Sequence, residues 1–301
     1  IGAANVILRE LHQPEYDTHV FPEEVVHFIQ PPYHRPNYIS GTPVSVENAF
    51  LAAAKCQGCL HPRCRKGCPA GIDIPGFLRR METKNYIGAA RLIHEKNPFG
   101  ETCGLNCAAN HLCQQFCYRR DFSGEPVNIA ELERWVCEQA GKDGWQKHEK
   151  STVNGEIAII GGGLAAMSCA YYLALSGWGI SIFAPENQPG GKLSEKMRSD
   201  PVLQASFNRD IRGIFAEEIR FFGNQNPVYE ADLKRMLKEY ACVFITKDQF
   251  SERENFDEVE KKSPGLFLGD EFLINGISPV EAVACGRKKA VEIYQYLRND
   301  L

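Results

Sequence analysis

The sequence predicts a helical domain followed by an α/β domain built on a parallel sheet, and its 301 residues suit about two domains. Most of the cysteines fall between residues 56 and 117, in a region whose apolar residues recur at helical spacing. Further along, an apolar strand at residues 156–160 runs directly into three glycines and an apolar helix, as in mononucleotide-binding folds. We therefore expect an extended arm over residues 1–44, a helical domain over 45–141, a linker over 142–155 and the α/β domain over 156–301.

The overall charge and the apolar stretches exclude several classes of protein. The formal net charge of −4 argues against a nucleic-acid-binding surface. Residues 157–185 carry no charge, but glycines interrupt them, and the helical part is too short to cross roughly 30 Å of hydrocarbon. No signal peptide is visible. Twelve cysteines in such a chain indicate a reducing, cytoplasmic location with the thiols bound to metal.

The first domain is expected to be helical between its loops. The prolines at positions 31, 32 and 36 block helix formation within the arm over residues 1–44. This arm is therefore expected to be either extended over a partner or disordered. Ser45 can cap the first helix, and Asn97-Pro98 ends the third. The expected helices cover residues 46–55, 74–84, 86–95 and 131–140.

The cysteine region reads C-x2-C-x4-C-x3-C-P and, after a long gap, C-x5-C-x3-C. Thiolates are soft ligands that suit iron, zinc and Cu(I). In ferredoxin-like runs with two clusters, the cysteine before the proline binds the other cluster. This rule predicts one set that is a ligand short and a second set of four. The first contains Cys56, Cys59 and Cys64, and the second contains Cys68, Cys107, Cys113 and Cys117.

Two other uses of these cysteines are possible. A disulfide framework belongs to short secreted domains, whereas these cysteines cluster in one third of a long chain. Zinc would favour two complete sets of four thiolates, and seven cysteines divide poorly into two such sets. The Cys-Pro pair therefore favours two [4Fe-4S] clusters over disulfides or zinc.

The α/β domain opens with a dinucleotide fingerprint, G-x-G-x-x-A, between a strand and a helix. Its glycines let the backbone approach a pyrophosphate, and the helix N-terminus supplies N–H donors to the phosphates. The expected contacts from this turn are Gly161, Gly163, Leu164, Ala165 and Ala166.

Two later turns add candidate contacts. The second strand, residues 179–184, ends at Ala184 where the fingerprint has an acid that holds ribose hydroxyls. Glu186 can substitute for that acid, although a solvent-facing loop glutamate is the simpler interpretation. A glycine turn with a cation follows, formed by Gly190, Gly191 and Lys192.

The remainder alternates helix and strand. We expect a long amphipathic helix over residues 201–222, a helix over 230–240, a strand over 241–246, a charged structureless stretch over 247–263, a strand over 265–268 and a helix over 278–297. The last strand leads through Gly-Asp to the last helix, whose dipole can stabilise a reduced, anionic flavin ring. Candidate contacts here are Gly269, Asp270, Ser278 and Val280.

Residues 45–140 resemble the N-terminal double-cluster domain of glutamate synthase small subunits and of dihydropyrimidine dehydrogenase, and residues 156–301 resemble the flavin domain of the same family. The phrases that carry the resemblance include Cys56-Gln57-Gly58-Cys59, Gly67-Cys68-Pro69-Ala70, Cys103-Gly104-Leu105-Asn106-Cys107 and Glu131-Leu132-Glu133-Arg134. The resemblance implies FAD as cofactor. It also implies an oxygen ligand at Glu133, which would complete the first set, and a cysteine at position 103 that is not a ligand.

The sequence departs from this family in one important respect. Family flavin domains carry an inserted NAD(P)H-binding domain of roughly 100 residues. Here Gly163 and Asp270 are 107 positions apart (270 − 163), and no second fingerprint lies between them. We therefore expect that this chain has no NAD(P)H site of its own.

The expected function is electron transfer within a larger redox complex. Two [4Fe-4S] clusters and FAD would relay electrons to partner subunits of the hydrogenase, formate dehydrogenase or bifurcating transhydrogenase type. One alternative is an NAD(P)H-dependent oxidoreductase of the glutamate synthase small subunit type. The other is a scaffold that keeps only the clusters, with a decayed flavin site.

Overall fold

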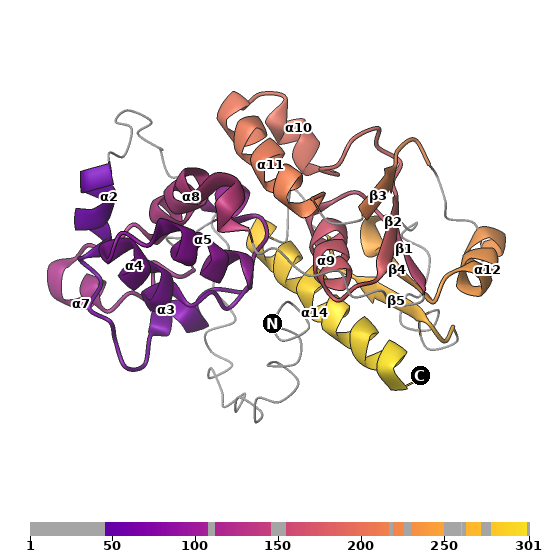
Figure 1. Cartoon of the computed structure of the whole chain (residues 1–301), viewed down its shortest axis with the longest axis horizontal. Coiled ribbons are helices and arrows are strands. Elements are labelled where there is room, and N and C mark those ends of the chain that lie inside the picture. Colours follow the sequence, from indigo (N-terminus) through magenta and orange to yellow (C-terminus); the bar gives the residue numbers. More distant parts are fainter. Residues whose placement is uncertain are drawn as a thin grey trace.

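The computed structural model describes residues 46–107, 112–145, 155–216, 219–225, 230–249, 260, 263–271 and 278–299. Figure 1 shows a helical domain, in indigo and magenta, beside an α/β domain in orange and yellow. The predicted arm over residues 1–44 and most of the predicted linker lie outside the described residues.

Short helices joined by tight turns form the first domain. They are α2 (Val46–Ala53), α3 (Arg63–Lys66), α4 (Ile74–Glu82), α5 (Tyr86–His94), α6 (Gly100–Asn106), α7 (Arg119–Ser123) and α8 (Ile129–Ala140). The Asp73 side chain accepts from Gly76 N at 3.3 Å and starts α4, and Asn85 starts α5 in the same way at 2.9 Å. Helix α8 packs against both α5 and α6 and so forms the centre of the domain.

The start of the predicted linker is ordered and packed. Residues Gly141–Gly144 form a 3-10 helix, η2, against α5. Arg91 Nε donates to Asp143 O at 3.1 Å, and His94 Nδ1 lies 3.0 Å from Gly144 O. Trp145 then stacks on His94, with 4.0 Å between ring centroids. The helical domain therefore continues to Trp145.

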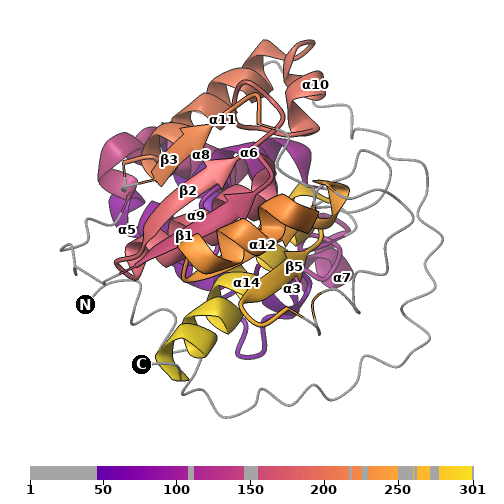
Figure 2. The same ribbon diagram turned by 90° about the vertical axis from the view of Figure 1, so that its right-hand side faces the viewer.

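The second domain is a five-stranded parallel sheet in the order β3-β2-β1-β4-β5. Its strands are β1 (Glu156–Ile160), β2 (Gly179–Phe183), β3 (Ile219–Phe222), β4 (Cys242–Thr246) and β5 (Leu266–Gly269). Figures 1 and 2 show α9 (Leu164–Leu175) and α14 (Pro279–Asn299) side by side along the sheet, with α12 (Glu230–Glu239) apart from them. The chain reverses direction across the sheet between β1 and β4, which is where such folds bind ligands.

The predicted helix over residues 201–222 is wrong in its last third. Helix α11 (Pro201–Ile214) ends before this point, and residues 219–222 form the edge strand β3, paired with β2. Phe222 stacks on Phe183 of β2 at 5.2 Å between ring centroids. A short apolar run satisfies both helical and strand spacing, so periodicity alone did not separate them. The short helices α10 (Leu193–Met197) and η3 (Lys247–Gln249) complete the described elements of this domain.

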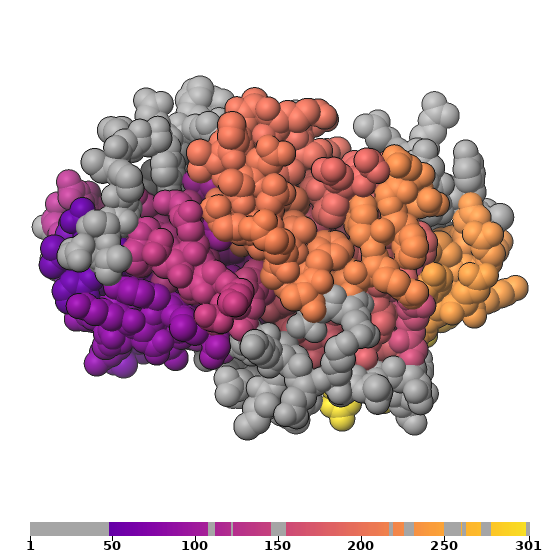
Figure 3. All heavy atoms as spheres, turned by 45° about the horizontal axis from the view of Figure 1, so that its top comes forward, coloured from indigo at the N-terminus to yellow at the C-terminus, as the bar shows by residue number. Residues whose placement is uncertain are grey.

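The two domains meet through buried polar contacts. Asp210 of α11 accepts hydrogen bonds from Thr102 N at 2.9 Å, Thr102 Oγ1 at 2.7 Å and Glu101 N at 3.4 Å, and thereby caps α6. Tyr172 of α9 donates to His94 O at 3.3 Å, and Arg287 of α14 donates to Ala70 O at 3.0 Å. Figure 3 shows the orange surface of α11 directly against the magenta surface of the first domain.

Candidate functional site

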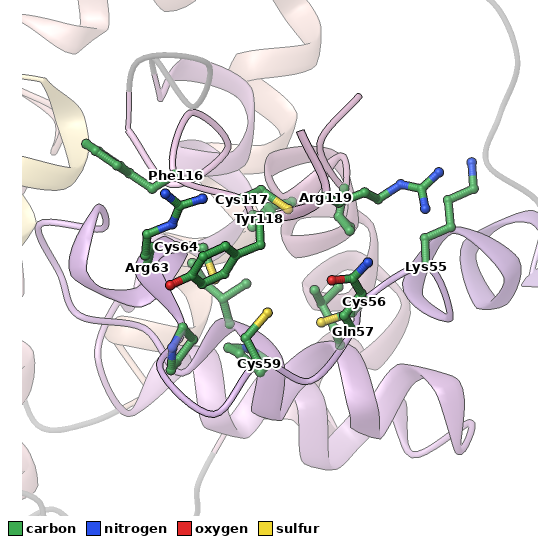
Figure 4. Close-up of a pocket in the computed structure, with 16 residues that line it drawn as sticks. Lys55, Cys56, Gln57, Cys59, Arg63, Cys64, Phe116, Cys117, Tyr118 and Arg119 are labelled. Carbon is green, nitrogen blue, oxygen red and sulfur yellow. The ribbon is translucent and has the colours of Figure 1, made fainter. Parts of the chain in front are cut away.

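Four cysteines surround one pocket of the helical domain (Figure 4). They are Cys56, which follows α2, Cys59 in the next loop, Cys64 in α3 and Cys117, which precedes α7. The pocket lies beside α7, at the end of that domain farthest from the sheet (Figure 1). The same pocket is lined by apolar side chains of α4 and the loop before α8, including Ile74, Leu78 and Val127. Lys55, Arg63 and Arg119 give it cationic neighbours.

The thiols of this first group influence one another. Burial, followed by the charges of Cys117 and Cys56, raises the pKa of Cys64 to about 12. Burial also raises the pKa of Cys56, with smaller contributions from Cys59 and Cys117. Cations stabilise thiolates, so a metal group bound among these four sulfurs would favour their deprotonated form.

A second group lies between the first and the α/β domain. Burial, followed by the charge of Glu133, raises the pKa of Cys68 to about 11. Burial also raises the pKa of Cys113, and its charged neighbours are Cys68, Glu133 and Cys64. For Cys107, the largest cause of the raised pKa is a hydrogen bond with Cys103, and Glu133 and Cys68 also contribute. Cys113 therefore lies between the two groups and makes them neighbours.

The buried side chain of Glu133 belongs to this second group. It is 7% exposed, and its Oε1 accepts from Asn97 Nδ2 at 3.2 Å. Burial raises its pKa to about 8. A surface glutamate would have no such environment, so the structure supports a functional position for this residue. Within the described residues, no three His, Cys, Asp or Glu side chains converge tightly enough for a single metal ion.

The grouping of the candidate ligands differs from the one expected from the sequence. The structure places Cys117 with Cys56, Cys59 and Cys64, and it places Glu133 with the second group. The cause lies in the turn between Cys113 and Cys117. Gln114 Oε1 accepts from Ala130 N at 3.0 Å and ties the start of this turn to α8, whereas Cys117 at its end lines the pocket beside α3 and α4. Spacing alone carried no signal for this division.

The remaining cysteines are in the environments expected of small core residues. Cys103, Cys137, Cys169 and Cys242 are buried, and Cys285 is partly buried. Cys103 Sγ lies 3.8 Å from Asn97 Oδ1. Cys285 Sγ accepts from Asp270 N at 3.3 Å.

The glycine turn of the α/β domain is tightly enclosed. Gly190 N donates to Gly162 O at 2.8 Å, and a Cβ on Gly191 would lie 3.0 Å from Gly163 Cα, so the second glycine turn rests directly on the first. Gly161 has φ +123° and faces Thr246 Oγ1, where a side chain would collide. These contacts require glycine at these positions.

The residues expected to contact a nucleotide lie in different environments, and Glu186 is the one that best fits its expected role. Glu186 does not simply face solvent, because its Oε2 is buried and has no hydrogen-bond partner among the described residues. That oxygen lies 3.3 Å from the position of a Cβ on Gly162, beside the fingerprint. A buried acceptor without a partner fits a ribose hydroxyl.

The second nucleotide-facing turn is less open than expected. Asp270 Oδ1 pairs with Lys247 Nζ at 3.1 Å, and its side chain is 51% exposed. Ser278 N donates to Glu281 Oε2 at 2.7 Å. Val280 is buried, Lys192 is exposed, and Gly269 packs against the Phe244 ring.

Sequence reasoning missed Glu271. Both of its carboxylate oxygens accept from Ala165 N, at 3.1 and 3.0 Å, and Oε2 lies 3.4 Å from Ala166 N. Glu271 is 3% exposed and caps α9 where the fingerprint would hold phosphates. The only available signal was an acidic residue directly after Gly-Asp, and this signal does not show whether the side chain points toward α9 or toward solvent. The candidate dinucleotide site therefore combines a group that fits a ribose with one that opposes a phosphate.

Comparison with known proteins agrees with this two-domain description. Residues 39–145 match the family described as dihydropyrimidine dehydrogenase domain II, 4Fe-4S cluster. Residues 159–215 match the NAD(P)-binding Rossmann-like domain family. Fold and sequence together thus show a helical domain similar to a 4Fe-4S cluster domain, followed by a Rossmann-like domain. The predicted resemblance and fold class are confirmed at this level.

Among individual proteins, the chain is similar to the PreT subunit of NAD-dependent dihydropyrimidine dehydrogenase. It is 29% identical over 199 residues to the homologue in Salmonella typhi and 28% identical over 199 residues to that of Escherichia coli (strain K12). These matches cover 66% of this chain and 48% of the relative. The putative oxidoreductase AegA of Escherichia coli is 29% identical over 206 residues, covering 67% of this chain and 31% of AegA. The chain thus spans about half or less of the length of these relatives.

Solved structures resemble the chain only weakly. The 6-hydroxypseudooxynicotine amine oxidase of Pseudomonas geniculata N1 is 16% identical, with a TM-score of 0.29 over 62% of this chain and 24% of that one. Histamine dehydrogenase of Rhizobium sp. 4-9 is 12% identical, with a TM-score of 0.31 over 65% of this chain and 26% of that one. Neither likeness supports an argument. No helix in the described part of the chain is long and apolar enough to cross a membrane.

Proposed function

We propose that this chain is an electron-transfer subunit of a larger cytoplasmic redox complex, in which two [4Fe-4S] clusters and FAD relay electrons to partner subunits. The observation that carries the proposal is the pair of adjacent four-donor groups, one at the outer end of the helical domain and one toward the α/β domain. Two neighbouring one-electron sites form a path rather than a catalytic centre. Partners of the hydrogenase, formate dehydrogenase or bifurcating transhydrogenase type would supply the reactions at its ends.

The proposed ligand sets follow the grouping in the structure. The first cluster would be held by Cys56, Cys59, Cys64 and Cys117, and the second by Cys68, Cys107, Cys113 and Glu133. Both sets fit the chemistry, because thiolates hold [4Fe-4S] clusters and one ligand of another type changes the potential. The buried carboxyl of Glu133 supplies a fourth donor where the second group has only three thiols.

The second group is well placed to exchange electrons with the α/β domain. Ala70, two residues after Cys68, accepts its hydrogen bond from Arg287 of α14. Burial is the main cause of the raised pKa of Glu133, and the nearby carboxyl group of Asp210 on α11 adds to it. The first group, in contrast, lies beside the exposed Leu60, which is 88% exposed. These positions support a path from the α/β domain through the second group to the first, and then to a partner.

Several features of the α/β domain fit one half of FAD, the proposed third redox group. The fingerprint, the parallel sheet and the buried Glu186 oxygen fit the adenosine half of a dinucleotide. A flavin supplies two-electron exchange with one reactant and one-electron exchange with clusters. The protein's own task there is to hold the ribose at Glu186 and the diphosphate at the first turn of α9.

Anaerobic purification of the chain tests this proposal. Two clusters predict about eight irons per chain and an equal amount of acid-labile sulfide. Stepwise reduction with dithionite, followed by electron paramagnetic resonance, should give two interacting signals because the groups are neighbours. About four irons, or none, would overturn the two-cluster relay. Mass spectrometry of the native assembly then identifies the partner subunits and the flavin together.

One observation favours a second candidate, an NAD(P)H-dependent oxidoreductase. The family that matches residues 159–215 is described as NAD(P)-binding, and the PreT relatives are named NAD-dependent. Stopped-flow mixing of the isolated chain with NADH or NADPH separates the two. If NADH or NADPH reduces the redox groups of the chain within the first turnover and without partners, the result favours the oxidoreductase. If neither nucleotide reduces them, the result favours the relay.

A further inference from the structure

The first turn of α9 already holds an anion from the protein itself. Gly163 caps the helix in extended conformation and offers no side-chain acceptor. The carboxylate of Glu271 supplies one instead, from 106 residues further along the chain, and accepts from Ala165 N through both oxygens. Carboxylate and phosphate oxygens use the same backbone donors, so only one of them can occupy this position.

The absence of a side chain at Gly163 makes this contact possible. A Cβ at position 163 would collide with the carboxyl carbon and both oxygens of Glu271. In a dinucleotide site the same absence lets the backbone approach the pyrophosphate. The carboxylate therefore fills the space that this glycine opens, as well as using the donors of the helix.

The neighbouring acid is turned away from the site. Asp270, the residue expected to reach a cofactor hydroxyl, is half exposed and pairs with Lys247 at the ends of β5 and β4. Glu271 is buried in its place. The Gly-Asp-Glu turn thus exposes its first acid and buries its second.

The ribose end of the same site remains available. Glu186 Oε2 is buried beside Gly162 and lacks a hydrogen-bond partner within the described part of the chain. A nucleoside without phosphates could use this acceptor and leave Glu271 undisturbed. A dinucleotide would have to displace the carboxylate or suffer its repulsion.

We propose that Glu271 is an internal competitor of the dinucleotide diphosphate, so that the site in this chain discriminates against phosphate-bearing ligands until the carboxylate leaves α9. The inference deepens the proposed FAD site, on which it partly rests. It also makes a distinct claim about phosphates, which holds for any ligand that carries a diphosphate.

Three ligands and three proteins test the claim. Isothermal titration calorimetry measures adenosine, ADP and FAD binding to the anaerobically purified wild-type chain, to Glu271→Gln and to Glu292→Gln. Glutamine keeps an acceptor oxygen near the helix and removes the charge. Glu292 pairs with Lys289 on α14, so its variant removes one negative charge from the same domain and leaves the hydrogen bonds of Glu271 to the first turn of α9 in place. Near- and far-ultraviolet circular dichroism confirms that both variants fold.

The expected result depends on the diphosphate. In Glu271→Gln, the Kd for ADP and FAD should fall at least tenfold, or about 1.4 kcal/mol, while that for adenosine stays within twofold. Glu292→Gln should resemble the wild type for all three ligands. Equal binding of ADP and FAD by wild type and Glu271→Gln overturns the inference, as does an absence of measurable ADP binding in both.

The two proposals fail in different ways. A gain for ADP without a gain for FAD supports Glu271 as the competitor and removes the flavin proposal. Tight FAD binding by the wild type, unchanged in Glu271→Gln, keeps the flavin and removes the competitor.

Discussion

The proposed division of eight candidate ligands into two sets is tested by counting iron in paired variants. Cys56→Ala combined with Cys117→Ala removes two ligands from one pocket, so it should destroy one cluster and retain about four of about eight irons. Cys68→Ala combined with Cys117→Ala removes one ligand from each group and should leave almost no iron. The division expected from spacing predicts the reverse for both pairs.

Iron counts in paired variants also test Glu133, the proposed oxygen ligand. Combined with Cys68→Ala, the change Glu133→Ala should retain about four irons, because both residues belong to the second group. Combined with Cys56→Ala it should leave almost none. Colorimetric iron analysis of anaerobic protein gives the counts, and electron paramagnetic resonance shows that the remaining signal is that of one isolated cluster.

The matched control is Cys137→Ala. Cys137 lies one turn after Glu133 on α8 and is 3% exposed. Burial, followed by the charge of Glu133, raises its pKa, but none of the candidate cysteine ligands is among its main charged neighbours. This variant should keep about eight irons. The reasoning is refuted if Cys56→Ala with Cys117→Ala loses all iron while Cys68→Ala with Cys117→Ala keeps half.

Three further predictions concern the domain interface, a buried histidine and the nucleotide site. Asp210→Ala leaves Thr102 N–H and Oγ1 buried without their acceptor, so urea unfolding should show a loss of roughly 3 kcal/mol; a loss below about 1 kcal/mol would contradict the capping role. Burial lowers the pKa of His94 from 6.5 to about 4, so the unfolded state binds the extra proton first, and stability should fall as pH drops below about 6.5, by up to about 3 kcal/mol near pH 4. The variant His94→Phe should have a flatter pH profile, and an unchanged slope would exclude His94 as the cause. Glu186→Ala should weaken adenosine binding several-fold in calorimetry, because about 1 kcal/mol of hydrogen bonding is lost; unchanged affinity would remove Glu186 from the site.

Local signals in the sequence were sufficient where one residue type determines one conformation. The strand–glycine–helix turn at Gly161 and the helix starts at Asp73 and Asn85 are of this kind. The signal was insufficient where the outcome depends on distant packing. Residues 219–222 became a strand because β2 offered an unpaired edge, which helical spacing cannot reveal.

The site shows the same limit more sharply. The cysteines of the candidate groups were recognisable as soft ligands, but their division depends on how the turn from Cys113 to Cys117 is fixed, and Gln114 fixes it through a hydrogen bond to α8. Glu133 was indicated by a resemblance and by no physical pattern. The role of Glu271 could not be predicted, because whether the Gly-Asp-Glu turn buries its first or its second acid is decided by contacts with Lys247 and α9.

Two helices of the proposed nucleotide site, α9 and α14, also contact the helical domain. Helix α14 begins at Pro279, near the nucleotide turn, and contacts the Cys68 loop through Arg287. These residues are eight positions apart (287 − 279), or about 12 Å along the axis. Helix α9 carries the fingerprint at its first turn and Tyr172, which bonds to His94 O, two turns later. These two helices therefore fix the separation between the proposed dinucleotide site and the second group of candidate ligands. Since this spacing does not depend on a partner, the chain itself sets the distance for the first step of the proposed relay.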